Sequence, residues 1–271
     1  MKIISSLIFL IFLWSCSDDK KLFSLVDNKI SGIDFNNVIY ETDEFNILTD
    51  EYIFNGGGIA VSDFNKDGLV DLFFTGNMVS NELYLNLGDL KFKNVTKESK
   101  LSTNGFWSTG VAVIDINLDG WMDIYVAGAM HKENRNNKLY INQGLNKQGI
   151  PTFIENASEY GIDDPSNSMS AAFFDYDRDG DLDLFVLNNE QNEMIPTNYR
   201  KKIIDGSAPS NDKLYKNNGD GSFTDVTIEA GIVFEGFGLS VTPVDINKDQ
   251  WVDLYITNDY LTNDLLYINQ K

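Results

Sequence analysis

Residues 63–71 read Asp-Phe-Asn-Lys-Asp-Gly-Leu-Val-Asp, and near copies of this stretch stand at 115–123, 175–183 and 245–253. Every copy has a carboxylate or amide side chain at positions 1, 3, 5 and 9 and an apolar side chain at positions 2 and 8. The distance between copies increases along the chain, so the repeated unit accepts insertions. A motif that recurs at this spacing predicts a repeat architecture.

The segments around each acidic stretch also repeat. Small apolar residues precede it at 58–61, 110–113, 170–173 and 239–242. A short apolar run and then a Leu-Tyr-x-Asn segment follow it, the latter at 83–86, 139–142, 214–217 and 266–269. A segment that begins with Phe closes the first three copies at 92–95, 153–156 and 223–226. Short segments rich in β-branched and aromatic residues, bounded by Asn, Asp and Gly, indicate strands. The sequence therefore predicts an all-β fold, a β-propeller built of four-stranded blades.

The loops, the Leu-Tyr-x-Asn strands and the Phe-Thr-Asp-Val-Thr segment at 223–227 resemble VCBS/FG-GAP repeats, which are related to the head of the integrin α subunit. The resemblance covers residues 31–271. Such propellers usually have seven blades, so four copies imply an incomplete, open ring, or an N-terminal piece of a longer lipoprotein of this family. Residues 31–40 either fill the last strand of the fourth blade or leave that edge open. An open ring would expose the apolar faces of its terminal blades and favour association.

The acidic loops have the composition of calcium sites. Calcium takes six to eight oxygen ligands, and a glycine at position 6 allows the sharp turn between them. An EF-hand is excluded because position 12 falls in a predicted strand, at Phe74, Val126, Val186 and Ile256. The alternative is a set of acidic turns without metal, in which the carboxylates would repel one another. The candidate metal ligands are Asp63, Asn65, Asp67, Asp71, Asp115, Asn117, Asp119, Asp123, Asp175, Asp177, Asp179, Asp183, Asp245, Asn247, Asp249 and Asp253.

The four sites are not expected to be equal. The third loop has carboxylates at all four ligand positions, with Asp177 where the other loops have Asn, so we expect it to bind calcium most tightly. The fourth loop has Gln250 in place of the glycine. A side chain at positive φ costs about 1 kcal/mol, so the fourth site is expected to be weaker.

The N-terminus predicts export. Residues 1–15 carry one lysine and then an apolar run, which is typical of a signal peptide. Cys16, the single cysteine, follows in a context that resembles the lipobox of bacterial lipoproteins, which implies lipidation of Cys16 and a tether over residues 16–30. Asp18 and Asp19 resemble the signal that sends some of these lipoproteins to the cell surface. We expect an outer-membrane lipoprotein, anchored by its acyl chains.

Charge and composition exclude several classes of function. The net charge of −20 opposes binding to nucleic acid. One histidine, His131, and one cysteine exclude zinc sites built from several such ligands, and no catalytic constellation can be identified. We therefore expect a binding, adhesion or structural module for an unknown protein or glycan. The alternatives are an envelope enzyme or subunit that acts on polysaccharide, and a truncated piece of a larger protein. The insertion at 188–212 is a candidate binding segment.

Overall fold

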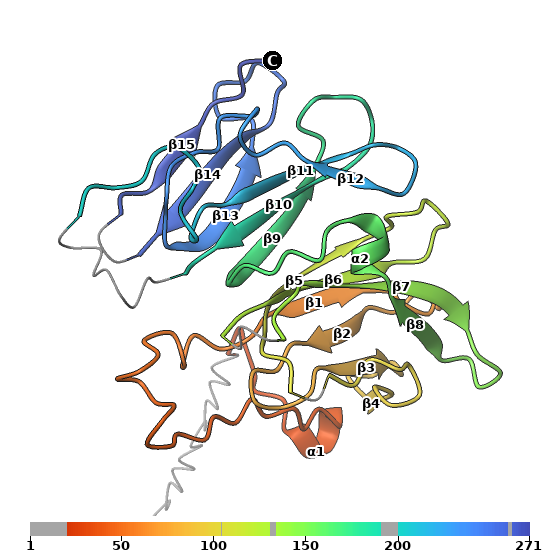
Figure 1. Cartoon of the computed structure of the whole chain (residues 1–271). Helices are drawn as coiled ribbons and strands as arrows, with labels where there is room; N and C mark the ends of the chain where they lie inside the picture. Colours follow the sequence, from red (N-terminus) through yellow and green to blue (C-terminus); the bar gives the residue numbers. More distant parts are fainter. Residues whose placement is uncertain (1–20, 104, 131–133, 191–199, 260–261) are drawn as a thin grey trace, which may run out of the picture.

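The computed structural model describes residues 21–103, 105–130, 134–190, 200–259 and 262–271. Four antiparallel sheets follow one another along the described chain, with two helices of four residues each (Figure 1). This arrangement is a four-bladed β-propeller, which confirms the predicted fold class. Neither of the two described helices is long or apolar enough to cross a membrane.

Each sheet is one blade, and its strands are neighbours in chain order. Blade 1 consists of β1 (Ile59–Ser62), β2 (Asp71–Phe74), β3 (Glu82–Asn86) and β4 (Phe92–Asn94). Blade 2 consists of β5 (Ser108–Ile114), β6 (Asp123–Gly128), β7 (Lys138–Leu145) and β8 (Pro151–Glu155). Blade 3 consists of β9 (Ser168–Phe174), β10 (Asp183–Asn188), β11 (Lys213–Asn217) and β12 (Phe223–Asp225). Blade 4 consists of β13 (Gly238–Val244), β14 (Asp253–Asn258) and β15 (Leu265–Tyr267). The helices are α1 (Asn28–Ser31) and α2 (Ala157–Tyr160).

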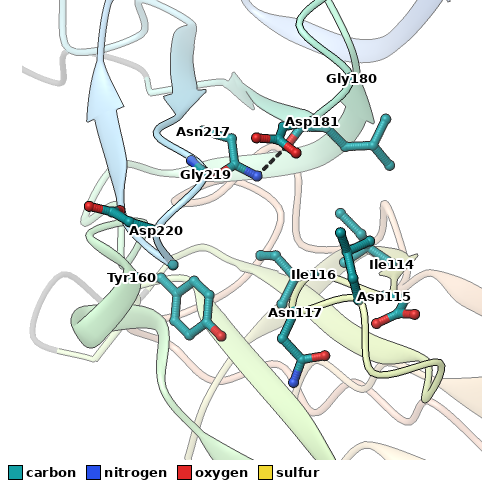
Figure 2. Close-up of a pocket in the computed structure, with 13 residues that line it drawn as sticks. Ile114, Asp115, Ile116, Asn117, Tyr160, Gly180, Asp181, Asn217, Gly219 and Asp220 are labelled. Carbon is teal, nitrogen blue, oxygen red and sulfur yellow. Dashed lines mark hydrogen bonds between the residues drawn. The ribbon is translucent and has the colours of Figure 1, made fainter.

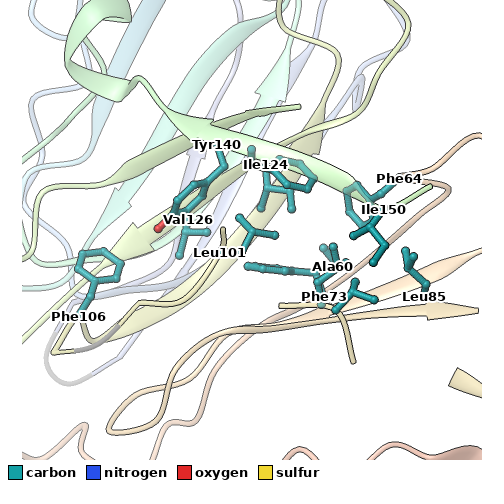
Figure 3. Packing of buried hydrophobic residues seen from close by; sticks show 13 residues of the cluster. Ala60, Phe64, Phe73, Leu85, Leu101, Phe106, Ile124, Val126, Tyr140 and Ile150 are labelled. Carbon is teal, nitrogen blue, oxygen red and sulfur yellow. The ribbon is translucent and has the colours of Figure 1, made fainter. Parts of the chain in front are cut away.

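The hydrophobic core is divided into layers that lie between consecutive blades. Figure 3 shows the layer between blades 1 and 2, where Phe64 and Phe73 face Ile124 and Ile150. The second strands contribute to the layers on both of their sides, since every residue of β6 and β10 is buried. This burial explains why these strands appear in the sequence as continuous apolar runs.

The blades form an arc. Innermost strands of consecutive blades pack together as β1 with β5, β5 with β9, and β9 with β13. No comparable contact joins the described strands β13 and β1. As a result, Ile59 and Val61 of β1 are 55% and 59% exposed, whereas Val111 and Val113 of β5 pack against the core between blades 1 and 2. The expectation of an open ring agrees with this arrangement.

The segment before blade 1 covers that blade's outer face. The ring of Phe35 stacks on that of Phe74 at a centroid distance of 5.0 Å. The Tyr84 hydroxyl donates a hydrogen bond to Asp34 Oδ1 at 2.7 Å, and Asn37 Nδ2 donates to Asn77 Oδ1 at 2.6 Å. Residues 31–40 therefore pack on blade 1, and β15 lies at the edge of the three-stranded sheet of blade 4.

The described part of the insertion at 188–212 folds back onto the chain. Arg200 donates two hydrogen bonds, of 2.8 Å each, to the carboxylate of Glu235, which is 4% exposed. The backbone amide of Ile203 donates to the same carboxylate at 2.9 Å. The insertion is thus attached to the loop before β13, at the end of the propeller opposite the acidic loops. Its proposed binding role remains a prediction.

Candidate functional site: four acidic loops and a groove between them

The four acidic loops each connect the first strand of a blade to the second, so they lie at one end of the propeller. Position 9 anchors each loop. In the first loop, Asp71 is fully buried, and its Oδ2 accepts a hydrogen bond from the backbone amide of Phe64 at 3.0 Å. Its Oδ1 accepts from the backbone amide of Asn86, in β3, at 2.8 Å. Asp123, Asp183 and Asp253 make the same pair of bonds. One carboxylate thus fixes both the start of the loop and the third strand.

Burial makes three of these anchor carboxyl groups weaker acids than an ordinary aspartate. It raises the pKa of Asp71, Asp123 and Asp183 to about 6, although the hydrogen bonds from backbone amides act in the opposite direction. The neighbouring loop carboxylates add a further increase by charge repulsion. A bound cation would relieve both costs, because it compensates the buried negative charge.

The asparagines of the Leu-Tyr-x-Asn segments complete the loops, a role that the sequence pattern did not indicate. Asn86 Nδ2 donates to the carbonyl of Val70, at loop position 8, over 2.9 Å. Asn142, Asn217 and Asn269 make the equivalent bond to Met122, Leu182 and Val252. The Asn that ends each third strand is the sequence signal for this role, although the pattern by itself indicates only a strand.

In loops 1, 2 and 4 the side chains at positions 1 and 3 accept hydrogen bonds from backbone amides of the same loop. Asp63 accepts hydrogen bonds from the backbone amides of Asp67 and Gly68, at 3.1 and 2.8 Å. Asn65 Oδ1 accepts from the same Asp67 amide at 3.1 Å. Loops 2 and 4 repeat these contacts through Asp115, Asn117, Asp245 and Asn247. The side chains at positions 1 and 3 are thus drawn together by backbone amides.

Loop 3 differs. Oxygens of Asp175, Asp177 and Asp183 all lie within 4.8 Å of one another, the one such group of three carboxylates among the described residues. Asp175 Oδ2 accepts from the amide of Gly180 at 3.2 Å, while its Oδ1 is buried with no hydrogen-bond partner. A buried oxygen without a donor is costly for the fold unless a cation occupies the site. The donor set, oxygen only, fits calcium.

Position 6 has positive φ in every loop, as the sequence predicts. The angle is 86° at Gly68, 83° at Gly120 and 98° at Gly180, and Gln250 adopts 74° in the fourth loop. Position 4 is also left-handed, with φ between 56° and 63° at Lys66, Leu118, Arg178 and Lys248. The second strained position was not expected, because no glycine marks it.

Two of the three junctions between neighbouring loops are closed by side chains. Lys66, at position 4 of loop 1, lies 4.1 Å from the ring centroid of Trp121, at position 7 of loop 2. Arg178 and Trp251 repeat this contact between loops 3 and 4, at 5.4 Å. At the same junctions Asn142 Nδ2 donates to the Phe64 carbonyl at 3.0 Å, and Asn269 Nδ2 donates to the Tyr176 carbonyl at 2.8 Å.

The junction between loops 2 and 3 is open. There positions 4 and 7 are Leu118, which is 81% exposed, and Asp181, so no cation–π pair can form. Among the described hydrogen bonds, Asn217 Nδ2 makes none to the carbonyl of Ile116. The result is a groove of about 420 Å³. Figure 2 shows the Tyr160 ring, from α2, and Asp220, in the β11–β12 turn, on one side of the groove, with Ile116 and Asn117 of loop 2 across from them.

The lining of the groove combines acidic and polar groups with the aliphatic side chains of Ile114, Ile116, Leu118 and Leu182. It includes the carboxylates of Asp115, Asp181 and Asp220 and the amide side chains of Asn117 and Asn217, and the described lining contains no lysine or arginine. Nearby acidic groups contribute, after burial, to a raised pKa of Tyr160. A groove with an aromatic wall and several acceptors can hold a cationic or hydroxyl-rich group.

Fold and loops together define a β-propeller whose blades each carry one acidic loop. Residues 63–126, 127–186 and 203–256 match the model of the FG-GAP-like repeat. The chain belongs to this family of repeat proteins, as its repeated segments had indicated. Cys16 and His131 lie outside the described residues, so the predicted lipidation stays a prediction.

The curated relatives are distant. The chain is 26% identical to a T-cell immunomodulatory protein homolog of Plasmodium yoelii yoelii over 168 residues, which cover 56% of this chain and 22% of that protein. It is 25% identical to cartilage acidic protein 1 of Mus musculus over 139 residues, or 50% of this chain and 21% of that protein. The matched regions thus span about a fifth of the length of these relatives. An Agrocybe aegerita lectin that recognises non-reducing terminal N-acetylglucosamine covers 78% of this chain and 49% of its own, with 15% identity and a TM-score of 0.45.

Proposed function

We propose that this chain is a calcium-stabilised binding module of the cell envelope, without catalytic activity of its own. The observation that carries the calcium part is the third loop. Three carboxylates converge there within 4.8 Å, and one oxygen of Asp175 is buried with no donor. In each loop, positions 1, 3, 5 and 9 would hold the ion, and the ion would supply the positive charge that the clustered carboxylates lack.

The repeated anchors give calcium a structural consequence. Asp71 and its equivalents join the loop to the third strand, so an ion bound at position 9 would connect three segments of one blade. Metal that binds only the native state stabilises it by mass action, by about 2.7 kcal/mol per site at a hundredfold excess over Kd. Extracellular calcium modules have Kd values of roughly 10⁻⁴ to 10⁻³ M. We therefore expect folding to depend on millimolar calcium.

The groove between loops 2 and 3 is our candidate for the partner site. It is the junction at which the side chains that close the other two are replaced, and its walls present Tyr160, Asp181 and Asp220. The proposed partner is a protein or glycan, since the net charge of −20 opposes nucleic acid. Loops on a rigid scaffold commonly carry such binding functions.

The calcium proposal is tested by thermal unfolding of the metal-stripped protein with added calcium or with chelator. A midpoint that rises with calcium concentration supports it. Asp177→Asn restores the residue found in the other loops and is a mild change, whereas Asp175→Asn removes a central ligand and should reduce the calcium-dependent shift. Identical midpoints in calcium and in chelator, after verified removal of metal, would show that the loops are acidic turns.

The envelope location is a separate proposal, with Cys16 as the lipid-modified residue. Cys16→Ser should release the protein from the membrane fraction or leave an unprocessed precursor. A variant that is cleaved normally and still sediments with membranes after a high-salt wash would contradict the lipid anchor. A separate experiment, protease treatment of intact cells that carry the wild-type protein, distinguishes a surface-exposed from a periplasmic position.

A further inference from the structure

Loop 3 differs from its three counterparts at two places that lie far apart in the chain. Its third position is Asp177, where the other loops have Asn65, Asn117 and Asn247. The variable residue of its Leu-Tyr-x-Asn segment is Lys216, where the other blades have Leu85, Ile141 and Ile268. An additional carboxylate in the loop is therefore accompanied by an additional amine on the neighbouring strand β11.

These two departures meet in the structure. Lys216 Nζ forms an ion pair with Asp177 Oδ2 and lies 3.3 Å from Asp179 Oδ2. The side chains of Asp177 and Asp179 are 23% and 38% exposed, so the pair is partly shielded from water. The ammonium thus occupies oxygens at positions 3 and 5, two of the four positions that would hold a metal ion.

Lys216 takes over a contact that an asparagine makes elsewhere. In loops 1 and 2, Asn65 and Asn117 donate from Nδ2 to the carboxylate at position 5, over 2.9 and 3.0 Å. Asp177 has no such donor, and the Lys216 ammonium bridges the two carboxylates instead. Loop 3 is also the loop in which the Asp175 Oδ1 atom has lost its backbone donor. The amine therefore bridges positions 3 and 5 in a loop that lacks one of the backbone hydrogen bonds found in the others.

We propose that Lys216 is an internal competitor for the calcium of loop 3, which compensates the fourth carboxylate in the metal-free protein and must leave when the ion binds. This inference rests on the proposed calcium function. Four carboxylates and one ammonium carry a net charge of −3, the same as the three carboxylates of each other loop. The additional carboxylate consequently gives loop 3 no advantage in affinity while Lys216 is in place, which changes the expectation drawn from its composition.

The test replaces Lys216 with the isoleucine that stands at the equivalent strand position in blades 2 and 4. In chelator, Lys216→Ile should lower the thermal midpoint, because Asp177 and Asp179 lose their counter-charge. In a calcium titration, the same variant should bind one calcium ion roughly tenfold more tightly than the wild type, since an ammonium no longer competes at contact distance. The two effects have opposite signs, as expected for an ammonium that compensates the loop carboxylates without metal and opposes the ion.

Lys213→Ile is the matched control. Lys213 lies on the same strand and pairs with Asp225 at 3.3 Å, away from the loop. Its replacement changes the net charge of the protein by the same amount but leaves the Lys216 contacts with Asp177 and Asp179 in place. Its calcium affinity should equal that of the wild type. The double variant Lys216→Ile with Asp177→Asn has the residues of blade 2 at both positions. Its thermal midpoint in chelator should return to the wild-type value.

The outcomes separate the two proposals. If the wild type responds to calcium and Lys216→Ile binds it no more tightly, Lys216 is a structural ion pair and this inference is wrong. If neither the wild type nor the variant responds to calcium, the calcium function itself is wrong, and the competitor role is rejected with it.

Discussion

Lys66 lies over the ring of Trp121, 4.1 Å from its centroid, and so connects the fourth position of one acidic loop to the seventh position of the next. Arg178 and Trp251 repeat the relationship two blades later. The intervening junction has Leu118 and Asp181 at these positions and remains open as a groove. The same repeated scaffold therefore carries two closed junctions and one open junction, which differ in the side chains at two loop positions and in the bond from the third-strand asparagine to the preceding loop.

Closing the open junction should stabilise the protein. The double change Leu118→Lys with Asp181→Trp copies the closed pair into loops 2 and 3, and a cation–π contact of this exposed kind contributes about 0.5 to 1 kcal/mol. Denaturant titration should show an increase of that size, and Lys66→Ala should show a decrease of similar size. A partner that binds in the groove should lose affinity for the closed variant. A destabilised double variant would mean that the open junction is shaped by other contacts.

Gln250, which stands where the other loops have glycine, should lower the stability of the protein through backbone strain. Gln250 adopts φ 74°, a region that costs a side chain about 1 kcal/mol relative to glycine. Gln250→Gly should therefore raise the free energy of unfolding by about that amount. Gly68→Ala is the reciprocal test, since an added Cβ there meets nothing within 4 Å and only φ is unfavourable. Equal stability of all three proteins would exclude strain at position 6.

The asparagines of the third strands should differ in importance. Asn142 is 1% exposed and donates to the carbonyls of Phe64 and Met122, which lie in different blades. The Asn217 amide donates within its own blade, to the Leu182 carbonyl, and to no other group among the described residues. Asn142→Ala should cost about 2 to 3 kcal/mol of unfolding free energy because buried carbonyls lose their donor, and Asn217→Ala about 1 kcal/mol. Comparable losses at both sites would contradict the inter-blade role of Asn142.

Asp212 should make stability depend on pH. Burial raises the pKa of this fully enclosed carboxyl from 3.8 to about 7, against the hydrogen bond that its Oδ1 accepts from the Asn188 amide at 2.9 Å. The unfolded chain releases this proton first as pH rises, so the contribution of Asp212 becomes increasingly unfavourable between pH 4 and 7 and is constant above that. Tyr267 keeps its proton throughout, since burial and then Asp212 raise its pKa to about 12.

Asp212→Asn should remove this dependence. Asn81 and Asn137 accept the equivalent backbone hydrogen bond in blades 1 and 2, at 2.9 and 2.8 Å, so an amide suits the position. The variant should be more stable than the wild type by about 4 kcal/mol at pH 8, with the difference disappearing near pH 4. Unfolding curves measured across this range provide the check. A constant difference at every pH would show that Asp212 does not titrate during unfolding.

Much of the fold could be predicted because its signals are local. Each acidic loop is nine residues long, and the positive φ at Gly68 and Gln250 follows from the turn itself. The strands are short runs of apolar residues next to that turn. Four copies of the same local pattern reinforce one another, since a single copy would be an ambiguous acidic turn.

Only the tertiary structure decided the contacts between segments that lie far apart in the chain. Lys216 meets Asp177 across 39 residues, Asn142 reaches Phe64 across 78, and Asn269 reaches Tyr176 across 93. The packing of residues 31–40 on blade 1 is likewise long-range. Such pairs depend on how consecutive blades stack, a geometry set by the volumes of the core layers between them. The repeat pattern therefore determined the blades and their loops, while the stacking of the blades determined which loops close on one another and which leave a groove.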